Sequence, residues 1–170
     1  MGGCVPETEA IIKPVESAVD PSVGLGALRG LFAHRAELLA GFEKFQASIA
    51  ESEALSLRVL ELCRLRVAAI HGAQEVWQMR DPAVQLGDEE LQALQSGEIA
   101  AACFSVSDSA ALAVAEAMPY NHHALEDEQV AALSEAFTHE GCVNLLTAVA
   151  FFDVSCRWQL VLRPSQAKPI

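Results

Sequence analysis

The chain has 170 residues, enough for one domain with a substantial hydrophobic core. Hydrophobic residues make up 52% of it and charged residues 20%, which excludes disorder as the dominant state. A formal net charge of −12 disfavours binding to nucleic-acid phosphates or anionic membranes, so we expect neither partner. We expect no membrane span either, because the apolar runs are too short.

The two ends of the chain differ from its middle. Residues 1–24 contain three prolines and little periodicity, so they predict an irregular arm, followed by one helical domain over 25–163 and a tail over 164–170. The start lacks the basic and apolar segments of a secretory peptide. Five cysteines without CxxC or metal-ligand spacing indicate neither disulfides nor a metal site. We therefore expect a cytoplasmic protein.

Helical periodicity begins near residue 25, and no alternating strand pattern interrupts it. Capping residues and prolines set the expected boundaries: Asp88 and Ser107 as N-caps, with Pro82, Pro119 and Pro164 as stops. The expected helices cover about 25–50, 56–80, 88–97, 107–118, 127–137 and 138–162. The sequence thus predicts an all-α, single-domain bundle of about six to eight helices.

Glu61 lies in the most informative segment, which runs from Leu60 to Ala73. On a helix, small and apolar residues fall within about 40° of it, while Arg58 and Arg64 flank it at about 60°. Two interpretations stay open. Glu61 is either a desolvated acid or base beside a pocket, or a structural partner of one of these arginines.

Two further groups of titratable side chains have helical spacing. His71 and Glu75 are four residues apart, which suits either an oriented imidazole–carboxylate pair or an ordinary surface pair. Asp153 interrupts an apolar run, and Arg157 at i+4 is its expected ion-pair partner. No glycine-rich phosphate loop or nucleophile motif is present.

The central run ELCRLRVAAIHG, from Glu61 to Gly72, resembles the carboxymuconolactone decarboxylase / alkyl hydroperoxidase D-like superfamily. The segment GDEELQAL, starting at Gly87, is similar to that family's glycine-then-acidic helix start. Segments starting at Phe32, Ala111 and Leu145 fit the rest of the pattern, so the resemblance covers about 31–160. It implies an all-helical domain and assembly as a homo-oligomer, a trimer or hexamer.

The chain departs from the redox-active members of that family. Glu61 matches the family's proton-relay glutamate, but Ala73 and Val76 stand at the two cysteine positions and Arg80 at the histidine position. Peroxide reduction needs a thiolate and a resolving thiol, so a thiol peroxidase is disfavoured. The resemblance implies instead a cofactor-independent acid–base enzyme, such as a decarboxylase, lyase, isomerase or cyclase.

The resemblance also assigns expected roles for a small organic acid or carbonyl substrate. Glu61 is the expected proton donor or acceptor, with His71 as its partner oriented by Glu75, and Arg80 would hold a substrate carboxylate. Glu61 and Ala73 would be about 18 Å apart on one straight helix. The resemblance therefore implies a break at His71–Gly72, with His71 pointing into the cavity beside Glu61. The alternatives are a non-catalytic binding or assembly protein and, last, a peroxidase-type antioxidant.

Overall fold

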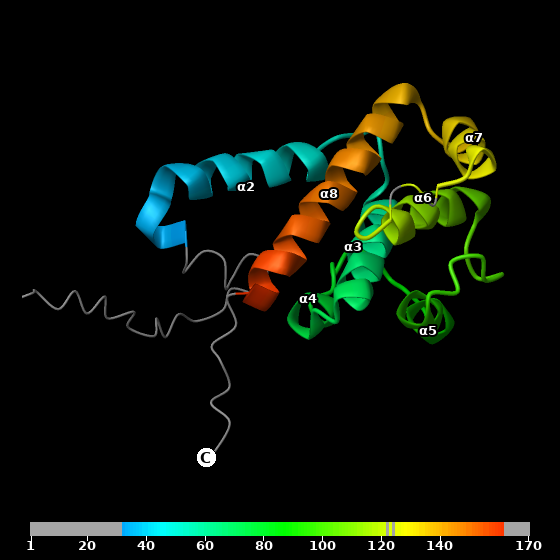
Figure 1. Cartoon of the computed structure of the whole chain (residues 1–170), viewed down its shortest axis with the longest axis horizontal. Coiled ribbons are helices and arrows are strands. Elements are labelled where there is room, and N and C mark those ends of the chain that lie inside the picture. Colours follow the sequence, from blue (N-terminus) through cyan, green and yellow to red (C-terminus); the bar gives the residue numbers. More distant parts are fainter. Residues whose placement is uncertain (1–31, 122, 124, 162–170) are drawn as a thin grey trace, which may run out of the picture.

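Helix α3 (Leu57–His71) is the central element of the computed structural model, which describes residues 32–121, 123 and 125–161. Its main neighbours are α6 (Val106–Ala117) and α8 (His139–Val161). Figure 1 shows α8 lying across α3, with α5 and α7 at the outside of the bundle. Most of α3 is buried, including the charged residues Glu61 and Arg66. Polar groups in this helix therefore need partners from elsewhere in the fold.

All other elements in the described part of the chain are helical as well. They are the short 3-10 helix η1 (Ala33–Arg35), α2 (Ala36–Ala50), α4 (Gln74–Gln78), α5 (Asp88–Ser96) and α7 (Asp127–Ala136). The prediction of an all-α fold is confirmed. The expected arm (1–24), the expected tail (164–170) and the expected helical residues 25–31 lie outside the described residues. Within the described ranges, no helix has both the length and the apolar character to cross a membrane.

The helical conformation is interrupted between α3 and α4 at Gly72, as the resemblance implied. Gly72 has φ +62°, the left-handed conformation that favours glycine after a helix. The backbone N–H of Ala73 donates to the carbonyl of Ala68 at 2.9 Å, which closes the helix end. The single segment over 56–80 suggested by periodicity alone is therefore two helices, and the second begins at Gln74.

Two expected caps are displaced along the chain. The N-cap of α6 is Ser105 rather than Ser107, because Ser105 and Asp108 each accept from the other's backbone N–H, at 3.1 and 3.2 Å. Asp88 is the first residue of α5 rather than its cap, because Glu90 accepts from the N–H of Gly87 at 2.7 Å. Helix α6 begins with a reciprocal pair of bonds and α5 with a single bond from its cap residue to Glu90, and local residue type alone locates neither.

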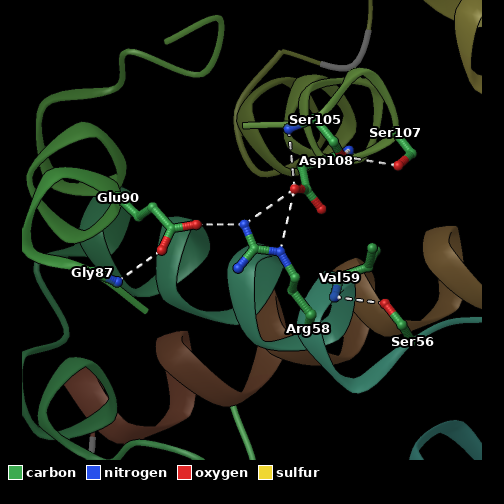
Figure 2. Close-up of polar contacts among 8 residues, drawn as sticks. All are labelled: Ser56, Arg58, Val59, Gly87, Glu90, Ser105, Ser107 and Asp108. Atoms are coloured by element: carbon green, nitrogen blue, oxygen red, sulfur yellow. Dashed lines mark hydrogen bonds and ion pairs between the residues drawn. The ribbon is translucent and has the colours of Figure 1, made fainter. Parts of the chain in front are cut away.

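The N-terminal end of α3 is held to α5 and α6 by Arg58 (Figure 2). Its guanidinium donates to Asp108 Oδ2 from Nε at 3.3 Å and from Nη2 at 3.2 Å, and Nη2 also pairs with Glu90. Both carboxylates are the ones that cap their own helices. Arg58 is thus engaged in the scaffold and is not the partner of Glu61.

The apolar core lies on both sides of α3. One cluster fills the space toward α6 and α8 and includes Val67, Leu145 and Val149. The other lies toward α5 and includes Leu62 and Leu94. Because these residues are nearly or fully buried, α3 is fixed in both rotation and position, and so are the side chains that it presents to α8 and α4.

Candidate functional site

Glu61 and Arg64 form a buried ion pair one turn apart on α3. Arg64 Nε donates to Glu61 Oε2 at 2.8 Å, and Arg64 Nη2 donates to Oε1 at 2.7 Å. The side chain of Glu61 is 5% exposed and that of Arg64 is 18% exposed. Two parallel bonds between a guanidinium and a carboxylate fix both groups in one orientation. Of the two arginines that the sequence offered, Arg64 is the partner.

The pair also holds the segment that follows α4. Arg64 donates to the carbonyl of Val76 at 2.7 Å and to the carbonyl of Met79. The backbone N–H of Asp81 donates to Glu61 Oε1 at 3.2 Å. The ion pair therefore fastens residues 76–81 to α3, and the break at Gly72 is what allows this return.

A cavity of about 710 Å³ lies beside the ion pair. Residues from α2, α3, α8 and the segment after α3 line it. The apolar lining residues are Ile49, Ala50, Leu57, Leu60, Val76, Met79, Pro82, Phe151 and Phe152. The polar ones are Gln46, Glu61, Arg64, Arg80, Asp81, Ser155 and Gln159. A largely apolar cavity of this size with a few converging polar groups is typical of a small-molecule site.

Arg80 stands in the cavity lining and is exposed to solvent. The carbon of its guanidinium lies 4.6 Å from the centre of the Trp77 ring, a cation–π contact that orients it. Partial burial and the nearby Arg64 lower the pKa of Arg80 below its ordinary value. Within the described part of the chain, no carboxylate forms an ion pair with Arg80. Its donors are available for an anion.

The structure separates His71 from Glu61. His71 Nε2 lies 2.6 Å from Asp153 Oδ1, and Nδ1 lies 3.0 Å from the hydroxyl of Tyr120. His71 is not among the lining residues of the cavity. The expectation that His71 points into the cavity is therefore wrong, because both ring nitrogens bond to groups on α8 and on the loop after α6.

Glu75 also lies away from the cavity lining. It is exposed on α4, and the acid next to His71 is Asp153 instead. The expected ion pair of Asp153 with Arg157 is confirmed, with Arg157 Nε 3.0 Å from each carboxylate oxygen. Of the four site residues that the sequence proposed, Glu61 and Arg80 share the cavity, whereas His71 and Glu75 do not.

Sequence reasoning missed the wall of the cavity formed by α8 and α2. Phe151, Phe152 and Ser155 come from α8, and Gln46 and Ile49 come from α2. The aromatic pair beside Asp153 was a visible signal, since it interrupts an otherwise aliphatic run. The position of these two phenylalanines in the cavity wall depends on how α8 crosses α3, which local spacing does not reveal.

The cysteines in the described part of the chain are all free. Burial raises the pKa of the Cys63 thiol, and it raises the pKa of Cys156 to about 12. Cys63 bonds to the carbonyl of Ala111 at 3.6 Å. These two buried thiols carry little thiolate at neutral pH, and neither lines the cavity.

The described residues form an all-helical domain with a cavity between its helices, and comparison of structures identifies the fold as AhpD-like. The crystal structure of ATU0492 from Agrobacterium tumefaciens superposes with a TM-score of 0.68 at 16% sequence identity. The match covers 82% of this chain and 96% of that one. That protein is named as one of unknown function and a candidate antioxidant defence protein, AhpD. No family model matches this sequence, and neither does any curated protein.

Proposed function

We propose that the chain is a cofactor-independent acid–base enzyme acting on a small organic acid or carbonyl compound. The observation that carries this proposal is a desolvated, oriented carboxylate, Glu61, in the wall of a mostly apolar cavity of about 710 Å³. A cavity of this size accepts a ligand of drug-like size or smaller. The resemblance of the run from Glu61 to Gly72 to the carboxymuconolactone decarboxylase-like superfamily favours the decarboxylase, lyase, isomerase or cyclase class.

Glu61 is the proposed proton acceptor and donor. Its Oε1 accepts from Arg64 and from the N–H of Asp81, and its Oε2 accepts from Arg64. A carboxylate has about four acceptor positions, so one position on Oε2 is available to a substrate proton. The Arg64 fork holds Glu61 in one orientation, which suits removal of a proton already acidified by an adjacent carbonyl.

Arg80 is the proposed binding group for a substrate carboxylate. Its guanidinium can form a bidentate bond with a carboxylate, and its contact with Trp77 holds the plane in place. The apolar part of the substrate would contact Phe151, Phe152 and Leu60. His71 and Glu75 have no role in this proposal, because neither lines the cavity.

The test is exchange of carbon-bound hydrogen in D2O, followed by proton NMR for a panel of small 2-oxo and 3-oxo acids. We expect exchange or loss of CO2 for at least one acid, and a drop of about 100-fold or more in Glu61→Gln. Arg80→Gln should raise KM for acids but not for their methyl esters. Arg35→Gln, an exposed arginine on η1, is the matched control. Equal exchange by the wild type and Glu61→Gln would overturn the role of Glu61.

A non-catalytic binding protein is the second candidate. The observation in its favour is that Glu61 already accepts three N–H bonds from the protein. A carrier would bind apolar acids, with affinity lost in Arg80→Gln, and would exchange no hydrogen. Calorimetry on the same panel separates the two candidates.

The antioxidant role named for ATU0492 fits this chain less well. Ala73 and Val76 carry no sulfur, and burial keeps the thiols of Cys63 and Cys156 protonated. We expect no steady-state consumption of hydroperoxides with a dithiol donor. Turnover lost in Cys63→Ala or Cys156→Ala would contradict this expectation.

Free cysteines in the described residues support the proposed cytoplasmic location.

We also propose that the chain assembles as a homo-oligomer, a trimer or hexamer. Exposed apolar side chains on α2 and α8 support this, among them Phe45, Val143 and Leu146. A second, shallow hollow between these helices is lined by Phe42, Phe45, Leu146 and Ala150. Light scattering should give a multiple of 18.2 kDa, and Phe45→Asp should reduce it. A monomer at micromolar concentration would contradict the proposal.

A further inference from the structure

Three side chains outside the cavity form a hydrogen-bonded chain that ends at the surface. Asp153 on α8 lies 2.6 Å from His71 Nε2, and His71 Nδ1 lies 3.0 Å from the hydroxyl of Tyr120. The side chain of His71 is 3% exposed, whereas Tyr120 is 66% exposed. A buried imidazole is thus connected directly to an accessible phenol.

The hydrogen positions follow from the partners. An ionised carboxylate only accepts, so Asp153 requires the hydrogen of the neutral imidazole to be on Nε2. The lone pair on Nδ1 is then available, and the Tyr120 hydroxyl donates to it. Hydroxyl, imidazole and carboxylate stand in the order that activates hydroxyl nucleophiles in enzymes.

Arg157 contacts both ends of this hydrogen-bonded series, Asp153 and the loop that carries Tyr120. Its Nε donates to both carboxylate oxygens of Asp153, and its Nη2 donates to the carbonyl of Pro119 at 2.7 Å. Its guanidinium carbon is also 5.6 Å from the centre of the Tyr120 ring. The same cation therefore anchors the loop that carries Tyr120 and contacts the face of its ring.

We propose that Tyr120 is a nucleophilic phenol and an acylation site, with activated carboxylic esters as its substrate class. The phenol oxygen forms a bond to the acyl carbon, and its proton passes to Nδ1 of His71. The bond from the acyl carbon to the leaving oxygen breaks, and the leaving group departs with that electron pair. The imidazolium so formed is paired with Asp153 and returns its proton to solvent. His71 is the general base, and Asp153 is a positioning residue.

This site is independent of the proposed cavity enzyme, because none of its three side chains lines the cavity. It also assigns a role to His71 and Asp153, two residues that the sequence singled out and that do not line the cavity. Tyr120 is the only tyrosine in the chain, so a chemical probe of phenols reports on one position.

The experiment uses p-nitrophenyl acetate on the full chain at neutral pH. Acetylation of the Tyr120 peptide is followed by mass spectrometry, and N-acetyltyrosinamide under the same conditions is the reference. We expect Tyr120 to react at least about tenfold faster than the reference, since a positioned general base contributes on that scale or more. Reaction at the reference rate would overturn the proposal. Hydroxylamine should remove the acetyl group, as expected for a phenyl ester.

Variants separate activation from simple exposure. His71→Gln should lower the rate to that of the reference, and His139→Gln, an exposed histidine at the start of α8, should leave it unchanged. Asp153→Asn provides a second route if His71→Gln does not fold, because it alters the tautomer and keeps the shape. Its rate should fall about tenfold or more while circular dichroism stays helical. An unchanged rate in a folded Asp153→Asn would also overturn the proposal.

Discussion

The two ends of α3 each carry a titratable side chain with a partner, but the partners differ in kind. Glu61 bonds to Arg64 three residues away and to backbone groups of the next segment. His71 bonds to Asp153, which is 82 residues away, and to Tyr120 on another loop. The first arrangement faces a cavity and the second connects to the surface. One buried helix therefore serves two separate environments.

The comparison shows that burial alone does not define a catalytic group. Glu61 and His71 have similarly small exposed fractions, 5% and 3% of their side chains. What distinguishes them is what lies next to each: empty space bounded by apolar groups at Glu61, and an exposed phenol at His71. Substitutions at the two ends should accordingly separate stability from ligand binding.

The largest effect is expected from breaking the ion pair at the cavity. Glu61→Leu leaves the buried Arg64 guanidinium without its carboxylate and should lower the free energy of unfolding by about 3 kcal/mol. The double variant Glu61→Leu/Arg64→Met removes both charges and should recover most of that loss. Urea denaturation measures both. Glu135→Leu, at an exposed glutamate on α7, is the control, with an expected change within about 0.5 kcal/mol. A single variant as stable as the wild type would show that the pair is dispensable.

A smaller effect is expected at the other end of α3. Asp153→Asn weakens the bonds to His71 and Arg157 and should cost about 2 kcal/mol, because both donors lose a charged acceptor. Binding of acids in the cavity should stay within about twofold of the wild type. Calorimetry and denaturation on the same preparation test this. A large loss of binding would show that the two ends of α3 are coupled.

Much of the fold was accessible from sequence because its signals are local. Ser105 with Asp108, Gly72 and Gly97 mark helix ends by hydrogen-bonding capacity or by a left-handed conformation, and each lies within one or two residues of an expected boundary. Only part of the candidate site has such local signals. Helical spacing singles out Glu61 as a candidate, whereas Arg80 is indicated only by the family resemblance.

The remaining site residues depend on tertiary contacts. Helical spacing makes Glu75 the expected partner of His71, but Gly72 breaks the helix between them and turns the two side chains apart. Asp153 meets His71 only because α8 crosses α3. Phe151 and Phe152 reach the cavity for the same reason. No periodicity within one helix encodes such a crossing.

Burial is the main cause that raises the pKa of the Cys156 thiol to about 12. Charged groups near both ends of α3 also act on this thiol, since Arg64 lowers its pKa and Asp153 raises it. This raised pKa stabilises the folded chain below the unfolded thiol value near 9, and the contribution is lost as pH rises from there toward 12. At pH 10 we expect wild type to have lost about 1.4 kcal/mol more than Cys156→Ala relative to pH 7. Urea titrations of both proteins at the two pH values measure the difference, and equal losses would contradict the burial of this thiol.

The smallest effect on the free energy of unfolding is expected at Gly72. This residue ends α3 directly after His71 and lets the following segment return to Glu61. A Cβ added there meets no atom within 4 Å, so the cost of Gly72→Ala is the left-handed backbone alone, about 1 kcal/mol. Gly41→Ala in the middle of α2 is the matched control, because its added Cβ also meets no atom and its backbone is helical. That control should gain about 0.5–1 kcal/mol. Opposite signs in thermal or urea unfolding would show that backbone conformation, and not space, fixes the turn that returns residues 76–81 to Glu61. A neutral Gly72→Ala would mean that the turn can relax to another conformation.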